Sequence, residues 1–126
     1  MRVLIVDDEK SIRTSTSAAI QAEGHQVDTA DSGQVSLLKL ADEAYDLAFL
    51  DLRLGDEDGL EVLGQIKRVA PQLPVVVFTA YASVSSAVAA IQRGAFDYLE
   101  KPFTPEHLRQ IISRVEATCS AVCLSG

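Results

Sequence analysis

The sequence predicts a single α/β domain with a mainly parallel, five-stranded sheet covered by helices on both faces. Short apolar, β-branched runs alternate with longer segments of helical periodicity five times along 126 residues, an order typical of such sheets. The runs 3–6, 47–50 and 75–78 are apolar throughout, as strands buried on both faces should be. The runs 26–30 and 96–99 mix polar and apolar residues, which predicts the two edge strands.

Amphipathic helices are predicted after these strands, because apolar residues recur there at the spacing of one helix face. The predicted stripes are Ile12, Thr16, Ala19 and Ile20 in the first helix; Val62, Leu63, Ile66, Val69 and Ala70 in the third; Val84, Ala87, Val88 and Ile91 in the fourth; and Leu108, Ile111, Ile112, Val115 and Cys119 in the fifth. Each stripe is expected to face the sheet.

Turn and capping residues predict where these elements begin and end. Gly24, Gly33 and Gly94 interrupt the periodic segments where loops are needed. Asp58 is placed to start the third helix. Thr104-Pro105 puts a capping hydroxyl before a first-turn proline and predicts the start of the fifth.

The composition predicts a folded domain rather than a disordered or membrane-spanning chain. Apolar residues make up 48% of the sequence, and no apolar run approaches the roughly 18 residues of a membrane span. The amino-terminal apolar run is too short for a secretory signal, so a cytoplasmic location is expected. Residues 1–116 are expected to form the domain and residues 117–126 a C-terminal tail, as the start of a linker or the end of a fragment.

Charge and cysteine content argue against two kinds of site. The net charge of −7 repels phosphate backbones, so direct binding of nucleic acid is not expected. Cys119 and Cys123 stand four residues apart, but no further Cys or His lies nearby to complete a zinc site, and both are expected to be reduced thiols. His25 and His107 flank helices and are expected at the surface.

Polar side chains follow four of the predicted strands at the point where each strand ends. They are Asp7, Asp8 and Glu9 after the first strand, Asp51 after the third, Thr79 after the fourth and Lys101 after the fifth. Ligand sites of such sheets lie outside the carboxyl ends of the strands. Acids at strand ends often only cap a helix or face solvent, but matching side chains at four strand ends predict a shared site.

The residue types at this predicted site favour phosphoryl transfer assisted by a metal ion. Adjacent carboxylates repel one another unless a cation neutralises them, and oxygen ligands without Cys or His favour Mg²⁺. Lys101 and Thr79 are suited to contact phosphate oxygens. No Ser–His or Cys–His arrangement offers another nucleophile, and Asp51 ends a central strand alone, whereas Asp7 and Asp8 are paired.

Four segments together carry a resemblance to a known family. They are 4–9 (LIVDDE), 49–52 (FLDL), 77–80 (VFTA) and 97–103 (DYLEKPF). In this order they resemble the receiver domain of two-component response regulators, over a match that spans Arg2 to about Val115. Segments 79–84 (TAYASV) and 94–98 (GAFDY) are further similar to receivers of the NtrC type, which precede an ATPase domain that activates sigma-54 transcription.

The resemblance implies a flavodoxin-like, doubly wound sheet with strand order 2-1-3-4-5 and five helices. It implies a phosphoacceptor domain, not an enzyme, which takes a phosphoryl group on Asp51 from a sensor histidine kinase and otherwise assists only its own phosphorylation and dephosphorylation. Mg²⁺ would be bound by Asp8, Asp51 and the backbone carbonyl of Arg53, with Asp7 acting through water.

The resemblance also implies how the signal would leave the site. Lys101 would contact the phosphoryl group, Thr79 would turn toward it, and Tyr98 would swing inward as a switch, with packing at the core edge as the alternative for Tyr98. The bond before Pro102 would be cis. The surface of the fourth helix, fifth strand and fifth helix would then control transcription through an effector domain in the full-length protein, and a homodimer through the fifth helix is a further expectation.

Three other readings of the motifs remain as alternatives. An aspartyl-phosphate-forming phosphatase or phosphotransferase for small molecules commonly carries a second acid where Arg53 stands. A nucleotide or flavin binder would need a Gly-rich loop after the first strand, in place of Asp7-Asp8-Glu9. A receiver-like module that is no longer phosphorylated would not need the complete set of acids, Thr79 and Lys101.

The segment 52–59 departs from the Met-Pro-Gly-type turn of many receivers, because it contains no proline.

Overall fold

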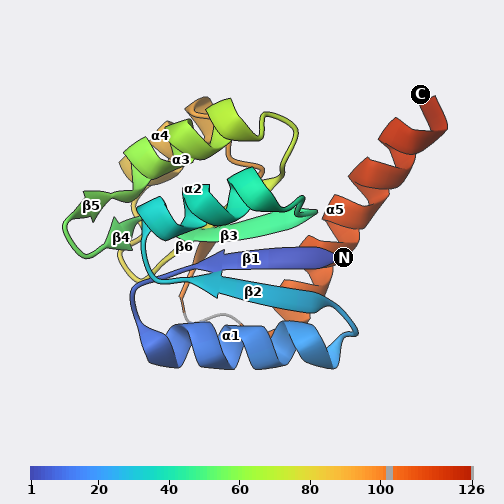
Figure 1. The fold of residues 1–126 in the computed structure, drawn as a ribbon, viewed down its shortest axis with the longest axis horizontal. Coiled ribbons are helices and arrows are strands. Elements are labelled where there is room, and N and C mark those ends of the chain that lie inside the picture. The colour runs from blue at the N-terminus through green and yellow to red at the C-terminus, as the bar shows by residue number, and fades with distance from the viewer. Residues whose placement is uncertain (102–103, 126) are drawn as a thin grey trace.

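The computed structural model describes residues 1–101 and 104–125 and has the predicted parallel sheet. Its strands are β1 (Arg2–Val6), β2 (Gln26–Ala30), β3 (Leu47–Asp51), β6 (Val75–Thr79) and β7 (Asp97–Glu100). They pair in the order β2-β1-β3-β6-β7, and every pairing is parallel (Figure 1). Counted along the chain, this is the order 2-1-3-4-5, so the flavodoxin-like topology is confirmed, with the two mixed runs at the edges.

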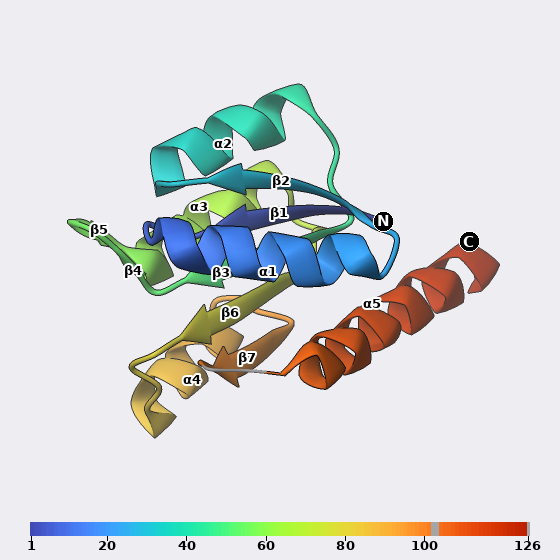
Figure 2. The same ribbon diagram turned by 90° about the horizontal axis from the view of Figure 1, so that it is seen from below.

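Helices cover both faces of the sheet. They are α1 (Lys10–Ala22), α2 (Gly33–Asp42), α3 (Gly59–Val69), α4 (Val84–Gln92) and α5 (Pro105–Ser125). One core lies under α2, α3 and α4, and the other lies under α1 and α5 (Figures 1 and 2). Side chains of a strand alternate between the two cores, with Leu4 and Val6 in the first and Val3 and Ile5 in the second. This burial on both sides explains why the central strands are apolar throughout.

Side-chain caps confirm two predicted helix starts. The carboxylate of Asp58 accepts a hydrogen bond of 3.0 Å from the backbone N–H of Leu60 at the start of α3. The hydroxyl of Thr104 accepts one of 3.2 Å from the backbone N–H of His107 in α5. Both side chains satisfy amides that have no partner within their own helix.

Glycines mark two turns and one helix start. Gly24 and Gly94 have φ values of +90° and +100° in the turns after α1 and α4, a conformation that only glycine adopts without steric cost. The prediction that Gly33 belongs to a loop is wrong, because Gly33 is the first residue of α2. Ser32 is the N-cap before it, and its side chain accepts a hydrogen bond from the amide of the third helical residue.

Three of the four predicted stripes contain the side chains that face the core. The buried members are Thr16 and Ile20 in α1; Val62, Leu63 and Ile66 in α3; and Leu108, Ile111, Ile112 and Val115 in α5. Val69 departs from its predicted position, because it lies at the last residue of α3 and is 52% exposed. Periodicity therefore identifies the inner face of these helices but not where that face ends.

The predicted inner stripe of α4 is wrong. Val84, Val88 and Ile91 are 83%, 50% and 51% exposed, Ala87 is half-buried, and the helix buries Ala90 instead. This helix is apolar around much of its circumference, so periodicity does not distinguish its inner face. The side chain that this nine-residue helix buries is thus the small methyl group of Ala90.

A small antiparallel hairpin, which the sequence analysis did not predict, follows β3. It consists of β4 (Arg53–Leu54) and β5 (Glu57–Asp58), and Gly55 turns it with a φ of +62°. The hairpin folds back on Leu52, whose carbonyl accepts a hydrogen bond of 2.9 Å from the backbone N–H of Gly59. A Cβ on Gly59 would lie 2.3 Å from the Cα of Leu52, so this approach requires glycine.

The second half of α5 extends beyond the sheet in both ribbon views (Figures 1 and 2). The chain stays helical to Ser125, so residues 117–125 of the predicted tail have helical backbone, while the domain boundary at 116 stays a prediction. Within the ranges 1–101 and 104–125, no helix combines the length and the apolarity needed to cross a membrane.

Candidate functional site

The carboxyl ends of four strands bring the predicted polar residues together. Asp7 and Asp8 follow β1, Asp51 and Thr79 are the last residues of β3 and β6, and Lys101 follows β7. Asp7, Asp51 and Thr79 are buried, whereas Asp8 is exposed. The residues meet because parallel strands present their carboxyl ends at one edge of the sheet.

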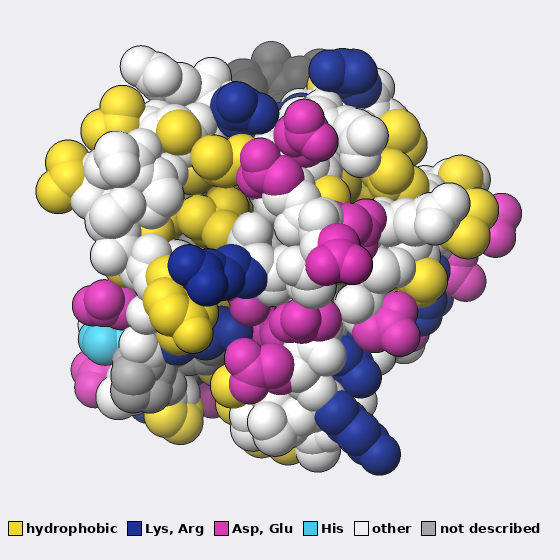
Figure 3. All heavy atoms as spheres, turned by 90° about the vertical axis from the view of Figure 1, so that its left-hand side faces the viewer, with side chains coloured by type: hydrophobic (Ala, Val, Ile, Leu, Met, Phe, Trp, Pro, Cys, Tyr) yellow, Lys and Arg dark blue, Asp and Glu magenta, His cyan; other side chains and the backbone are white. Residues whose placement is uncertain are grey.

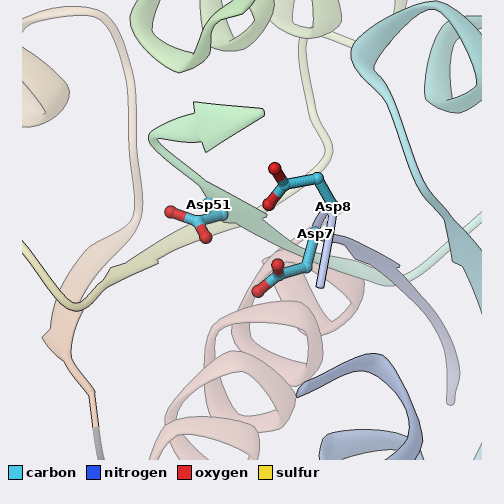
Figure 4. Close-up of side chains that lie close together, drawn as sticks. All are labelled: Asp7, Asp8 and Asp51. Carbon is cyan, nitrogen blue, oxygen red and sulfur yellow. The ribbon is translucent and has the colours of Figure 1, made fainter. Parts of the chain in front are cut away.

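The three aspartates form a compact oxygen cluster. Each of Asp7, Asp8 and Asp51 offers a carboxylate oxygen, and these oxygens all lie within 4.8 Å of one another (Figure 4). Figure 3 looks onto the face where the strands end and shows acidic side chains gathered there, with basic side chains beside them. A charged ligand would approach the cluster from this face.

The ammonium group of Lys101 bridges the two buried carboxylates. Its Nζ lies 2.7 Å from Oδ2 of Asp7 and 2.9 Å from Oδ2 of Asp51. Burial alone would lower the pKa of Lys101, but the hydrogen bonds to these carboxylates outweigh it and leave that pKa raised. Burial raises the pKa of Asp7, and the hydrogen bond from Lys101 offsets this only in part. One lysine therefore does not compensate the charge of three carboxylates.

Backbone amides orient all three carboxylates. The amide and acceptor pairs are Glu9 with Asp7 (2.9 Å), Arg53 with Asp51 (3.1 Å) and Gly55 with Asp8 (3.0 Å). Two of these amides belong to the loop and hairpin after β3, so the position of that segment affects the direction in which Asp51 and Asp8 are held.

The donor set fits Mg²⁺. The cluster consists of oxygens alone, as hard divalent cations prefer, and Asp8 is open to solvent, so an ion there would keep water ligands. Positive charge at this place would offset the repulsion that Lys101 leaves. The water-mediated role of Asp7 and the ligand role of the Arg53 carbonyl stay predictions.

A contact between the β3 and β6 loops was missed by the sequence analysis. Thr79 accepts a hydrogen bond of 3.1 Å at Oγ1 from the backbone N–H of Tyr81. The guanidinium group of Arg53 lies over the exposed ring of Tyr81. Lys101 lies with its Nζ 4.6 Å from the centre of the Phe78 ring, beneath the site. The contacts of Arg53 with Tyr81 and of Lys101 with Phe78 each join segments far apart in the sequence, so no local pattern predicts them.

Tyr98 joins β7 to the start of α4. Its hydroxyl lies 2.6 Å from Oγ of Ser86 and accepts a long hydrogen bond of 3.4 Å from the backbone N–H of Ser83. Ser83 and Ser86 form the capping box of α4. The predicted switch residue is thus connected to the helix that follows Thr79, while its movement stays a prediction. Pro102, with its predicted cis bond, lies outside the described residues.

The sequence matches one family model over most of its length. Residues 3–113 match the model described as the response regulator receiver domain. Among curated proteins, the chain is 45% identical over 108 residues to the alginate biosynthesis transcriptional regulatory protein AlgB of Pseudomonas putida, an alignment that covers 86% of this chain and 24% of that protein. The chain thus spans about a quarter of the length of the curated relatives it matches.

Solved structures of similar fold cover the chain more evenly. The receiver domain of NtrX from Brucella abortus superimposes with a TM-score of 0.85 at 39% identity, over 90% of this chain and 96% of that one. The beryllofluoride-activated NtrC4 receiver domain dimer gives a TM-score of 0.86 at 38% identity, over 90% and 94% of the two chains. The likeness therefore extends over nearly the whole of each compared chain.

Proposed function

The chain belongs to the response regulator receiver domain family, as its motifs predicted, and from this premise we propose that it accepts a phosphoryl group on Asp51. One observation carries the proposal: Asp51 is buried at the end of a central strand, 2.9 Å from the Lys101 ammonium and beside two further aspartates. A carboxylate nucleophile, a cation and a metal-binding oxygen cluster are the parts that phosphoryl transfer needs.

In the proposed reaction, an oxygen of the Asp51 carboxylate attacks the phosphorus of a phosphohistidine on a sensor kinase. The P–O bond forms, the P–N bond breaks, and the leaving imidazole takes up a proton. Lys101 neutralises charge on the phosphoryl oxygens, and the hydroxyl of Thr79 donates a hydrogen bond to one of them. Asp8, Asp51 and the carbonyl of Arg53 would hold Mg²⁺, with Asp7 acting through water, and the bound ion would supply further positive charge to the phosphoryl group.

The output of the proposed reaction is a change at the surface of α4, β7 and α5. A phosphoryl group beside Thr79 would draw its hydroxyl away from the amide of Tyr81. Tyr98 would then lose its place at the Ser83–Ser86 capping box and move inward, which would alter the exposed side of α4.

The wider setting of the domain is proposed from its relatives. AlgB is named as a transcriptional regulatory protein, and only 24% of its length aligns with this chain. We therefore propose a receiver of the NtrC type that acts in the cytoplasm, within a longer sigma-54 activator with its own effector domain. The similarity to a receiver dimer supports the proposal of a homodimer.

Intact mass after incubation with acetyl phosphate and Mg²⁺ tests the proposed phosphoacceptor. Wild-type protein should gain one phosphoryl group, and it should gain none with a chelator or after Asp51→Asn. Asp56→Asn is the matched control, because it makes the same chemical change at an exposed acid of the adjacent hairpin and should leave labelling intact. Full labelling of Asp51→Asn at the same site would contradict the assignment.

A further inference from the structure

Glu57, the first residue of β5, reaches from the hairpin to the start of α2. Its Oε1 accepts a hydrogen bond of 2.8 Å from the backbone N–H of Gly33. A Cβ on Gly33 would lie 2.9 Å from Oε2 of the same carboxylate, so both oxygens lie against the first turn of α2. That turn contains no acidic residue of its own. Glu57 therefore supplies, from another segment, the negative charge that stabilises a helix amino terminus.

The other side of the same hairpin contacts the acid cluster. The backbone N–H of Gly55 donates to Oδ2 of Asp8 at 3.0 Å, and the backbone N–H of Arg53 donates to Oδ1 of Asp51 at 3.1 Å. Figure 1 shows the hairpin and the start of α2 at the edge where β1 and β3 end. One short segment thus contacts α2 through Glu57 and two of the three carboxylates through its backbone.

Apart from Glu57, the contact of the Arg53 guanidinium with the Tyr81 ring holds the hairpin in place. Leu54 is buried beneath it, but Arg53, Gly55 and Asp56 are exposed. Each strand has only two residues, so the hairpin ladder alone is weak. The charged contact between Glu57 and α2 adds to these contacts in holding the two donating amides over the carboxylates.

We propose that Glu57 is a positioning residue for the divalent cation. It does not contact the cluster itself. By tying the hairpin to α2, it holds the amides of Arg53 and Gly55, and through them the carboxylates of Asp51 and Asp8, in the arrangement that binds the ion. This inference rests on the proposed function, in which Mg²⁺ binds at this cluster. Because coupling is reciprocal, bound Mg²⁺ must in turn strengthen the contact between Glu57 and Gly33.

Titration of the 126-residue chain with Mg²⁺, followed by amide NMR signals and without any phosphodonor, tests the proposal. Glu57→Ala should raise the Kd for Mg²⁺ by about three- to tenfold, in the range expected for losing a charge at a helix amino terminus. Glu57→Gln keeps an acceptor oxygen and should give an intermediate value. Asp56→Ala is the matched control, because it removes an exposed negative charge from the same hairpin and should change the Kd by less than about twofold.

Hydrogen exchange at the Gly33 amide separates positioning from a simple charge effect. Mg²⁺ should slow this exchange in wild type and leave it unchanged in Glu57→Ala. An unchanged Kd in both Glu57 variants, or equal weakening by Glu57→Ala and Asp56→Ala, would overturn this inference and leave the proposed function intact. Wild-type protein that binds no Mg²⁺ would overturn both. If Glu57→Ala fails to fold, as seen by circular dichroism, Glu57→Gln decides in its place.

Discussion

The guanidinium carbon of Arg53 lies 3.8 Å from the centre of the Tyr81 ring. Arg53 follows Asp51 by two residues, and Tyr81 follows Thr79 by two. The amide of Arg53 donates to the Asp51 carboxylate, while the amide of Tyr81 donates to the Thr79 hydroxyl. The stacked pair therefore links the loop after the proposed phosphoacceptor to the loop after Thr79.

This link predicts energetic coupling between the two side chains. Arg53→Ala, Tyr81→Ala and the double variant should give a coupling free energy of about 0.5–1 kcal/mol, because the cation and the ring meet at an exposed site. Urea unfolding of the four proteins measures it. Arg53→Lys is the conservative control and should retain part of the coupling, since it keeps the charge but loses the planar group. Strictly additive single effects would show that the stacking contributes no stability.

Lys101→Met is expected to destabilise the fold by about 3 kcal/mol, because it leaves two buried carboxylates without their cation. Mg²⁺ should recover part of this loss, since a ligand that binds only the native state stabilises it. The free energy of unfolding in urea, with and without Mg²⁺, checks both statements. Lys10→Met, at an exposed lysine of α1, is the control and should change stability by less than about 0.5 kcal/mol. If the Lys101→Met protein were as stable as wild type, the ion pairs of Lys101 with Asp7 and Asp51 would contribute nothing to stability.

Tyr45 predicts a loss of stability at alkaline pH. Burial, and then the hydrogen bond of 2.7 Å that its hydroxyl donates to Asp28, raise the pKa of Tyr45 well above its usual value of 10.0. Above the usual pKa of 10.0, the unfolded chain releases the phenol proton while the folded chain keeps it. The unfolded state then binds fewer protons than the folded state, so the free energy of unfolding falls as pH rises. Unfolding free energies measured from about pH 8 to pH 11 should fall less steeply for Tyr45→Phe than for wild type.

Substitutions on the two sides of α4 should change the stability of the fold to different extents. Val88→Lys should change the free energy of unfolding by less than about 0.5 kcal/mol, because Val88 faces solvent. Ala90→Leu should cost about 1–3 kcal/mol, because Ala90 is fully buried and has no room for added methylenes. Thermal and urea unfolding of both variants test this orientation. A larger loss for Val88→Lys than for Ala90→Leu would mean that the predicted stripe faces the core after all.

The sheet could be predicted from the sequence because burial on both faces leaves a strong local signal. The strands Leu47–Asp51 and Val75–Thr79 contain no polar residue before their last position, whereas the two edge strands do. The inner face of α4 could not be predicted, because Val88 and Ala90 are both apolar and only packing against the sheet chooses between them. The hairpin β4–β5 was missed because two-residue strands have no measurable period.

The residues of the candidate site were predictable for a different reason. Asp7, Asp51, Thr79 and Lys101 directly end or follow strands, so strand boundaries and parallel topology suffice to bring them together. The contact of Glu57 with Gly33, 24 residues apart in the sequence, depends on how the hairpin packs against α2. Neither residue type predicts such a contact. The stacking of Arg53 on Tyr81 could not be predicted for the same reason, because it depends on how two loops lie against each other.

The ion pair between Lys101 and Asp7 joins residues 94 positions apart. A chain that has placed β1 and β3 but not yet β7 therefore has two carboxylates facing each other without their lysine. Forming a contact of such high sequence separation requires that the entropic cost of closing a long loop be overcome first. Partly folded chains, or chains truncated before β7, would present an incomplete nucleophile site. The proposed phosphorylation of Asp51 therefore requires the complete fold. The fraction of protein labelled by acetyl phosphate would then also report the fraction of molecules that are fully folded.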